Sequence, residues 1–128
     1  MKAVLATLAG KCILVVEDET IIALDLQLTL GDHGASVAGP FGGAPEALAR
    51  IDGAVGVPRI DAAVLDVSLG DHTCEVIAAR LRELGVPFVL HSGDWLAADE
   101  LVTSLGAPVI RKPATTDEVI QAIAALLS

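Results

Sequence analysis

Short apolar runs alternate five times with segments of helical pattern, and this alternation constrains the fold more than any other feature of the sequence. The runs are rich in aliphatic residues, as strands buried on both faces are. Strands are expected at residues 12–16, 35–38, 62–65, 87–91 and 108–111, and helices at residues 20–30, 45–51, 73–84, 96–105 and 116–127. Such alternation predicts an α/β fold, a parallel sheet with helices on both faces. For five strands the most economical order is the flavodoxin-like 2-1-3-4-5.

The length and composition fit one domain. The chain has 128 residues, of which 1–10 are expected to form a short N-terminal extension and 11–128 the domain. Hydrophobic residues make up 53% of the chain and the mean hydropathy is +0.65, which is enough for a packed core and excludes a disordered chain. Since no residues follow Ser128 in this sequence, we expect the domain to act on its own.

The charge and the cysteines limit the partners. A formal net charge of −9 argues against nucleic-acid binding and suits a protein that binds cations or other proteins. No apolar run approaches the roughly 20 residues of a membrane span, so no membrane partner is expected. Cys12 and Cys74 lie far apart and are expected to be free thiols in a reducing cytosol, which predicts a cytoplasmic protein.

Polar side chains follow four of the five predicted strands. Ligands of an open parallel sheet bind at the carboxyl ends of its strands. The residues at these ends are Glu17 and Asp18 after the first strand, Asp66 after the third, Ser92 after the fourth and Lys112 after the fifth. The second strand is followed by the glycine-rich residues 39–43, which match neither a phosphate loop nor a dinucleotide motif and are expected to form a plain connector.

These residue types suit phosphoryl transfer. Mg²⁺ prefers oxygen ligands and is usually held by one or two carboxylates, so Asp18 and Asp66 could bind it directly and Glu17 through a water. Asp66 could also attack phosphorus as a nucleophile. Lys112 and Ser92 could then neutralise or hydrogen-bond the oxygens of the transferred group.

Four short motifs at these strand ends resemble those of the receiver domain of two-component response regulators. The motifs are Val15-Val16-Glu17-Asp18-Glu19, Val64-Leu65-Asp66, His91-Ser92-Gly93 and Arg111-Lys112-Pro113. The resemblance implies phosphorylation of Asp66 by a sensor histidine kinase or a phosphotransfer protein. It also implies Mg²⁺ bound by Asp18, Asp66 and the backbone carbonyl of Ser68, with Glu17 in the outer shell, and a cis peptide at Lys112-Pro113.

The sequence departs from the common receiver pattern at three positions. Glu17 stands where many receivers have aspartate, and Ser92 where threonine is commoner. Val109 stands where receivers carry the aromatic residue that turns inward on activation, so the signal must be read by another element. Trp95 either takes over part of that role or is an ordinary side chain at the start of a helix.

Further residues are expected to modulate the site. Ser68 and Asp94 are expected to flank the phosphoryl group and to tune its lifetime. Pro87-Phe88 followed by Ser92-Gly93 is similar to a subgroup of single-domain receivers that lack the aromatic switch, some of which work with kinases of the HWE type. His33, His72 and His91 show no metal-ligand spacing.

The first predicted helix carries a wide apolar stripe. Ile21, Leu24 and Leu28 are expected to belong mainly to the core. Ile22 or its neighbours, left exposed near the acidic residues, could dock the helix bundle of a kinase, as receivers generally do with this helix.

The sequence is compatible with three functions. The first is a stand-alone receiver that catalyses its own phosphorylation and dephosphorylation without being a turnover enzyme, and that switches interactions with a downstream protein target. The second is a degenerate receiver that serves only as a binding scaffold. The third is a phosphatase resembling the haloacid dehalogenase class, which expects a second aspartate two residues after the first, where this chain has Ser68.

Overall fold

The computed structural model describes residues 8–53, 59–67, 73–92, 109–111 and 116–127 of the chain. Strands and helices alternate through the first four strands, as the sequence predicts. The strands are β1 (Cys12–Val16), β2 (Ser36–Phe41), β3 (Ala62–Val67), β4 (Phe88–Ser92) and β5 (Val109–Arg111), and the helices are α1 (Thr20–Asp32), α2 (Ala44–Asp52), α3 (Thr73–Glu83) and α5 (Thr116–Leu127). The helix predicted at residues 96–105 lies outside the described residues.

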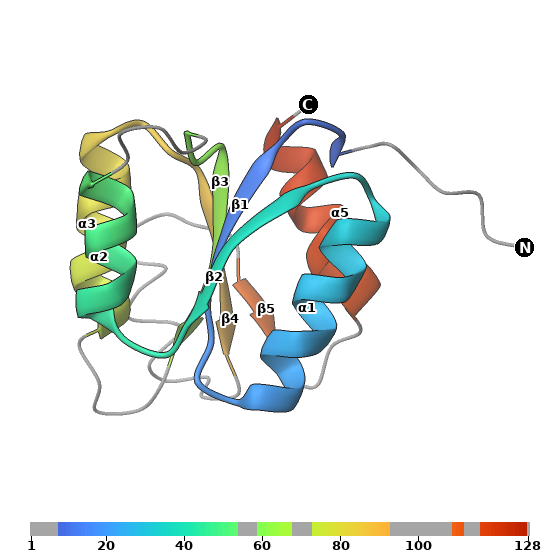
Figure 1. Cartoon of the computed structure of the whole chain (residues 1–128), viewed down its shortest axis with the longest axis horizontal. Helices are drawn as coiled ribbons and strands as arrows, with labels where there is room; N and C mark the ends of the chain where they lie inside the picture. The colour runs from blue at the N-terminus through green and yellow to red at the C-terminus, as the bar shows by residue number, and fades with distance from the viewer. Residues whose placement is uncertain (1–7, 54–58, 68–72, 93–108, 112–115, 128) are drawn as a thin grey trace, which may run out of the picture.

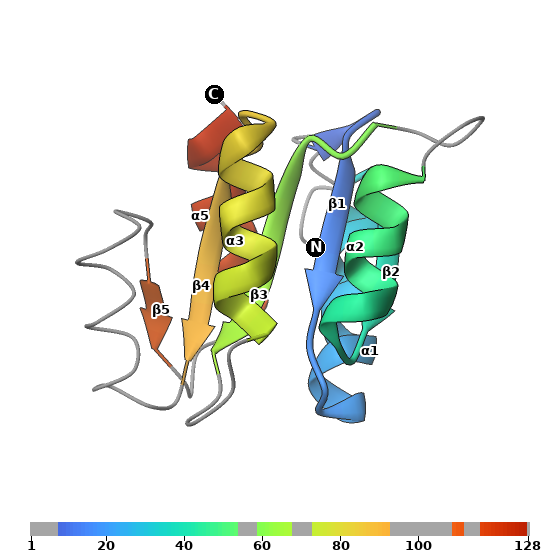
Figure 2. The same cartoon turned by 90° about the vertical axis from the view of Figure 1, so that its left-hand side faces the viewer.

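Strands β2, β1, β3 and β4 form a parallel sheet in that order. The flavodoxin-like order is confirmed for β2-β1-β3-β4, and the three residues of β5 pair with β4 at the edge. Helices α1 and α5 cover one face of the sheet, and α2 and α3 cover the other (Figures 1 and 2). No helix in the described parts of the chain is both long and apolar enough to cross a bilayer.

Side-chain alternation along the central strands divides the core into two layers. Successive strand residues point to opposite faces of a sheet, so each strand supplies both layers. Val64 and Val89 pack with α1 and α5, whereas Leu65 and Leu90 pack with α2 and α3. Leu8, which falls in the expected N-terminal extension, is also fully buried, in the layer beneath α1 and α5.

The stripe of α1 that the sequence assigns to the core is exposed, so that prediction is wrong. The exposed fraction is 84% for Ile21, 53% for Leu24 and 60% for Leu28. The helix instead buries Ala23, Leu26 and Leu30. Because α1 carries apolar residues on nearly every side, the 3.6-residue period does not select one face, and packing against the sheet and α5 decides which side is buried.

Strand β2 is longer than predicted and includes part of the expected connector. It runs through Gly39-Pro40, a cis peptide bond, to Phe41, which lies opposite Val16 of β1. The pairing register shifts between Leu14 and Val16, and a proline is tolerated there because β2 is an edge strand. Gly39 has φ of +102°, and a Cβ there would lie 2.9 Å from the carbonyl oxygen of Val15, so the close approach of the two backbones requires glycine.

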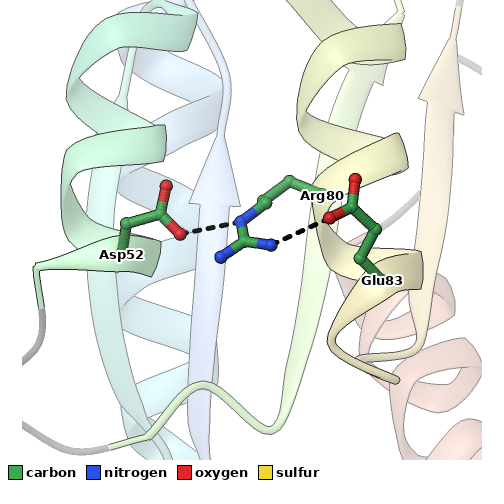
Figure 3. Close-up of polar contacts among 3 residues, drawn as sticks. All are labelled: Asp52, Arg80 and Glu83. Carbon is green, nitrogen blue, oxygen red and sulfur yellow. Dashed lines mark hydrogen bonds and ion pairs between the residues drawn. The ribbon is translucent and has the colours of Figure 1, made fainter.

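Two polar contacts join neighbouring helices. Arg80 of α3 places Nε 2.8 Å from Oδ1 of Asp52 in α2, and Nη1 2.9 Å from Oε2 of Glu83 (Figure 3). The hydrogen bond to Asp52 and the charge of that carboxylate raise the pKa of Arg80 above its ordinary value. Thr116 is the first residue of α5, as predicted, and its hydroxyl donates to Oδ2 of Asp25 in α1.

Candidate functional site

Three carboxylates meet at the carboxyl edge of the sheet. Val16 of β1 lies opposite Leu65 of β3, so the next residues along the two strands, Glu17 and Asp66, come to the same edge. Asp18 follows Glu17 in the turn before α1. One carboxylate oxygen each of Glu17, Asp18 and Asp66 can be chosen so that all three lie within 4.8 Å of one another. We call these three residues the acidic cluster.

The three acids differ in their exposure. Glu17 is only 4% exposed, Asp66 is half-buried and Asp18 is exposed. A buried carboxylate is unfavourable unless polar groups compensate it. The Oε2 atom of Glu17 accepts a hydrogen bond of 3.2 Å from the backbone N–H of Glu19, and the backbone N–H of Glu17 donates to the carbonyl of Phe41 at 2.9 Å. The buried acid is therefore anchored through its backbone to β2, while Asp18 remains accessible to ligands.

A histidine lies beside the acidic cluster and was not recognised as part of it from the sequence. His91 of β4 is 4% exposed, and its Nδ1 lies 3.9 Å from Oε1 of Glu17. It is also the register partner of Asp66. The signal in the sequence was a titratable residue inside an apolar run, where Val89 and Leu90 are fully buried.

The acidic cluster has the chemistry of a divalent-cation site. Three like charges within 4.8 Å repel one another, and a bound cation relieves that repulsion. Carboxylate oxygens are the ligands that Mg²⁺ prefers, and two or three of them leave room for waters and a phosphate oxygen. The residues present therefore fit Mg²⁺.

Other predicted site residues can be placed only partly. Ser92 ends β4, and its backbone lies opposite Val67, one residue beyond Asp66, and opposite Arg111 of β5. Val109 is the first residue of β5. Ser68, Asp94, Trp95 and Lys112 lie outside the described residues, so the roles predicted for them stay predictions.

Two open hollows border α1, and one of them also borders the acidic cluster. The first, of about 420 Å³, is lined by Glu17, Asp18 and Gln27 together with Pro40 and Gly42 of the β2–α2 connection. The second, of about 760 Å³, lies between α1 and α5, and its lining includes the exposed α1 leucines, His91, Thr116 and Val119. The acidic cluster can thus be reached from solvent, and an apolar surface lies next to it.

Solved structures similar to this chain include response regulator receiver domains. A CheY-like response regulator receiver domain protein from Methanospirillum hungatei JF-1 matches with a TM-score of 0.77 at 25% identity, covering 91% of this chain and 93% of that one. A response regulator receiver protein from Sinorhizobium medicae WSM419 matches with a TM-score of 0.77 at 29% identity, covering 91% and 94%. One from Burkholderia phymatum, at 22% identity and a TM-score of 0.78, covers 92% and 95% and supports the fold alone. No protein-family model and no curated protein matches the chain.

Proposed function

The chain shares the fold of CheY-like response regulator receiver domains over most of its length, and from this premise we propose that it is a phosphoacceptor of two-component signalling. Asp66 receives a phosphoryl group from a sensor histidine kinase or a phosphotransfer protein in a Mg²⁺-dependent reaction. The observation that carries the proposal is the acidic cluster, three carboxylates within 4.8 Å of one another at the carboxyl edge of a receiver-like sheet. The chain modifies itself and is not a turnover enzyme.

The chemistry follows from the position of Asp66. A carboxylate oxygen of Asp66 attacks the phosphorus of a phosphohistidine, an O–P bond forms, the P–N bond breaks, and the imidazole nitrogen keeps the electron pair. Bound Mg²⁺ supplies positive charge that offsets the charge of the phosphoryl oxygens. Asp18 and Asp66 would hold the ion with the backbone carbonyl of Ser68, and Glu17 would act through a water. By resemblance, Lys112 and Ser92 take the remaining oxygens.

The different burial of the three acids is consistent with a different role for each of them in phosphoryl transfer. The half-buried Asp66 is accessible enough for a donor to approach, and its place in β3 is fixed by pairing with His91 of β4. Exposed Asp18 can exchange ligands with solvent, whereas buried Glu17 is held in place by the backbone of Glu19. A nucleophile needs this fixed geometry, because a reacting group that is already oriented loses less entropy on the way to the transition state.

Labelling by a small acyl phosphate tests the proposal without a partner protein. The purified chain is expected to gain one phosphoryl group, seen by intact mass, in acetyl phosphate and MgCl₂, and to lose it when EDTA replaces Mg²⁺. A chain that binds Mg²⁺ but gains no phosphoryl group from any donor would instead be a scaffold with a receiver fold.

The exposed face of α1 suits a phosphodonor. Ile21, Leu24 and Leu28 lie at helical positions i, i+3 and i+7, so they form one exposed stripe. The stripe borders the hollow of about 760 Å³, and Glu19 and Asp25 also line that hollow. We propose that the apolar stripe receives the helix bundle of a kinase or phosphotransfer protein, and that phosphorylation then switches binding of a downstream protein in the cytoplasm. In this proposal β5 is the fifth strand of a receiver sheet. Val109 stands in place of the aromatic switch residue, so the phosphorylated state is read out through Trp95 or another element.

Leu24→Ser should separate docking from chemistry. Because Leu24 belongs to the stripe and not to the acidic cluster, we expect phosphotransfer from a cognate kinase to fall at least about tenfold. Labelling by acetyl phosphate should be unchanged. Leu84→Ser is the matched control, since Leu84 is 40% exposed and follows α3 on the opposite face of the sheet. Equal loss of both reactions in Leu24→Ser would contradict a docking role for the stripe.

A further inference from the structure

His91 is an unusual residue for its position in the sheet. It lies in β4, a strand whose neighbouring residues Val89 and Leu90 are fully buried, and is itself only 4% exposed. An imidazole carries two ring nitrogens, and burying such a polar group is unfavourable unless it meets a polar neighbour. A residue that only filled the core here would be aliphatic. The position therefore points to an interaction that an aliphatic side chain could not make.

Glu17, the buried member of the acidic cluster, is a polar neighbour of His91. His91 lies two residues after Val89, and Asp66 lies two residues after Val64, so both side chains emerge on the face covered by α1 and α5. His91 also lines the hollow between these helices. Its Nδ1 is 3.9 Å from Oε1 of Glu17, which is longer than a direct hydrogen bond.

The two oxygens of Glu17 thus face different neighbours. Oε2 accepts the N–H of Glu19, and Oε1 faces the imidazole of His91. Both side chains are almost completely buried, with 1% of Glu17 and 6% of His91 exposed, so solvent screens the contact little. A glutamate has one more rotatable bond than an aspartate, so contacts to its carboxylate restrict a freedom that an aspartate does not have.

We propose that His91 is a positioning residue, which holds the carboxylate of Glu17 toward Asp18 and Asp66 so that the acidic cluster binds Mg²⁺ tightly. The inference rests on the proposed function, because it assigns a role toward the Mg²⁺ of that site. It further implies that Glu17 and His91 act as a pair. An aspartate at position 17 would withdraw the carboxylate by about 1.5 Å, one carbon–carbon bond, and would lose the contact with His91.

A mutant cycle tests the pair through Mg²⁺ binding alone. Mg²⁺ affinity is measured by titration, followed through the backbone NMR signals of Asp18 and Glu19, in the wild-type chain, His91→Leu, Glu17→Asp and the double variant. We expect His91→Leu to weaken Mg²⁺ binding about tenfold in the wild-type background. In the Glu17→Asp background the same change should alter the affinity less than about twofold, because the contact is already lost.

Two amide variants keep the proposal testable if His91→Leu does not fold. The amide nitrogen of an asparagine falls near the place of Nδ1, whereas that of a glutamine falls near Nε2. His91→Asn should therefore bind Mg²⁺ within about threefold of wild type, and His91→Gln should lose affinity as His91→Leu does. Equal affinity in His91→Asn, His91→Gln and wild type would overturn the proposal, as would an equal effect of His91→Leu in both backgrounds.

The outcomes for the wild-type chain separate this proposal from the proposed function. If the wild-type chain binds Mg²⁺ and is phosphorylated while all His91 variants bind Mg²⁺ equally well, only the positioning role fails. If the wild-type chain neither binds Mg²⁺ nor accepts a phosphoryl group, the proposed function fails and the role of His91 fails with it.

Discussion

Asp66→Asn is expected to abolish phosphorylation of the chain by acetyl phosphate and by a phosphorylated kinase. The substitution keeps the size of the side chain but replaces the nucleophilic carboxylate with an amide, which carries no charge and is a poor nucleophile. Asp66 is half-buried and pairs in β3 with His91 of β4, so the variant should fold with the wild-type structure. The measurement is the intact mass of the chain after incubation with the donor and Mg²⁺.

A matched control distinguishes loss of the nucleophile from loss of negative charge. Asp32→Asn removes the same charge from an exposed aspartate at the far end of α1, 14 residues along the chain from Asp18, and should be labelled as fast as the wild-type chain. Labelling of Asp66→Asn at the wild-type rate would show that another residue is the acceptor.

Asp18→Asn is expected to weaken Mg²⁺ binding and to stabilise the fold when Mg²⁺ is absent. Without Mg²⁺ the three carboxylates of the acidic cluster repel one another within 4.8 Å. Removing one charge should therefore raise the free energy of unfolding in EDTA by about 1 kcal/mol, a value kept low because Asp18 is exposed to solvent. The same change removes a ligand, so Mg²⁺ affinity should fall by about 100-fold.

Thermal unfolding with and without Mg²⁺ measures both effects. The wild-type chain should gain about 2–3 kcal/mol at a Mg²⁺ concentration 100 times its Kd, and Asp18→Asn should gain less than about 0.5 kcal/mol at that concentration. The wild-type chain should thus be the less stable of the two in EDTA and the more stable in Mg²⁺. A variant that is less stable than wild type under both conditions would show that Asp18 stabilises the fold and does not serve a cation.

The end of β1 could be predicted from the sequence because it depends on local pattern. The bounds of β1 agree with the prediction, since the apolar run from Cys12 ends where Glu17 and Asp18 begin. The parallel-sheet rule then brings the acids of different strands to one edge, and the structure places Glu17, Asp18 and Asp66 together there. Neither step required knowledge of distant contacts.

The predictions from the sequence fail where tertiary packing, and not local pattern, decides which residues are buried or paired. In α1, leucines lie on several faces, and contact with α5 and the sheet, not periodicity, buries Leu26 and exposes Leu24. In β2, pairing with Val16 extends the strand over Gly39-Pro40, which local propensity assigns to a turn. The contact between His91 and Glu17 joins two strands 74 residues apart in the sequence that are not adjacent in the sheet, since β3 lies between them, and no spacing rule connects such positions.

Reductive trapping tests the claim that Asp66 carries the phosphoryl group. Borohydride reduces an aspartyl phosphate to homoserine, so the wild-type chain is phosphorylated in Mg²⁺, reduced, digested and sequenced by mass spectrometry. We expect homoserine at position 66 in the sample with Mg²⁺ and none in the sample with EDTA. Homoserine at another aspartate, or a phosphoryl group that resists reduction because it is attached to a hydroxyl or an imidazole, would contradict the claim.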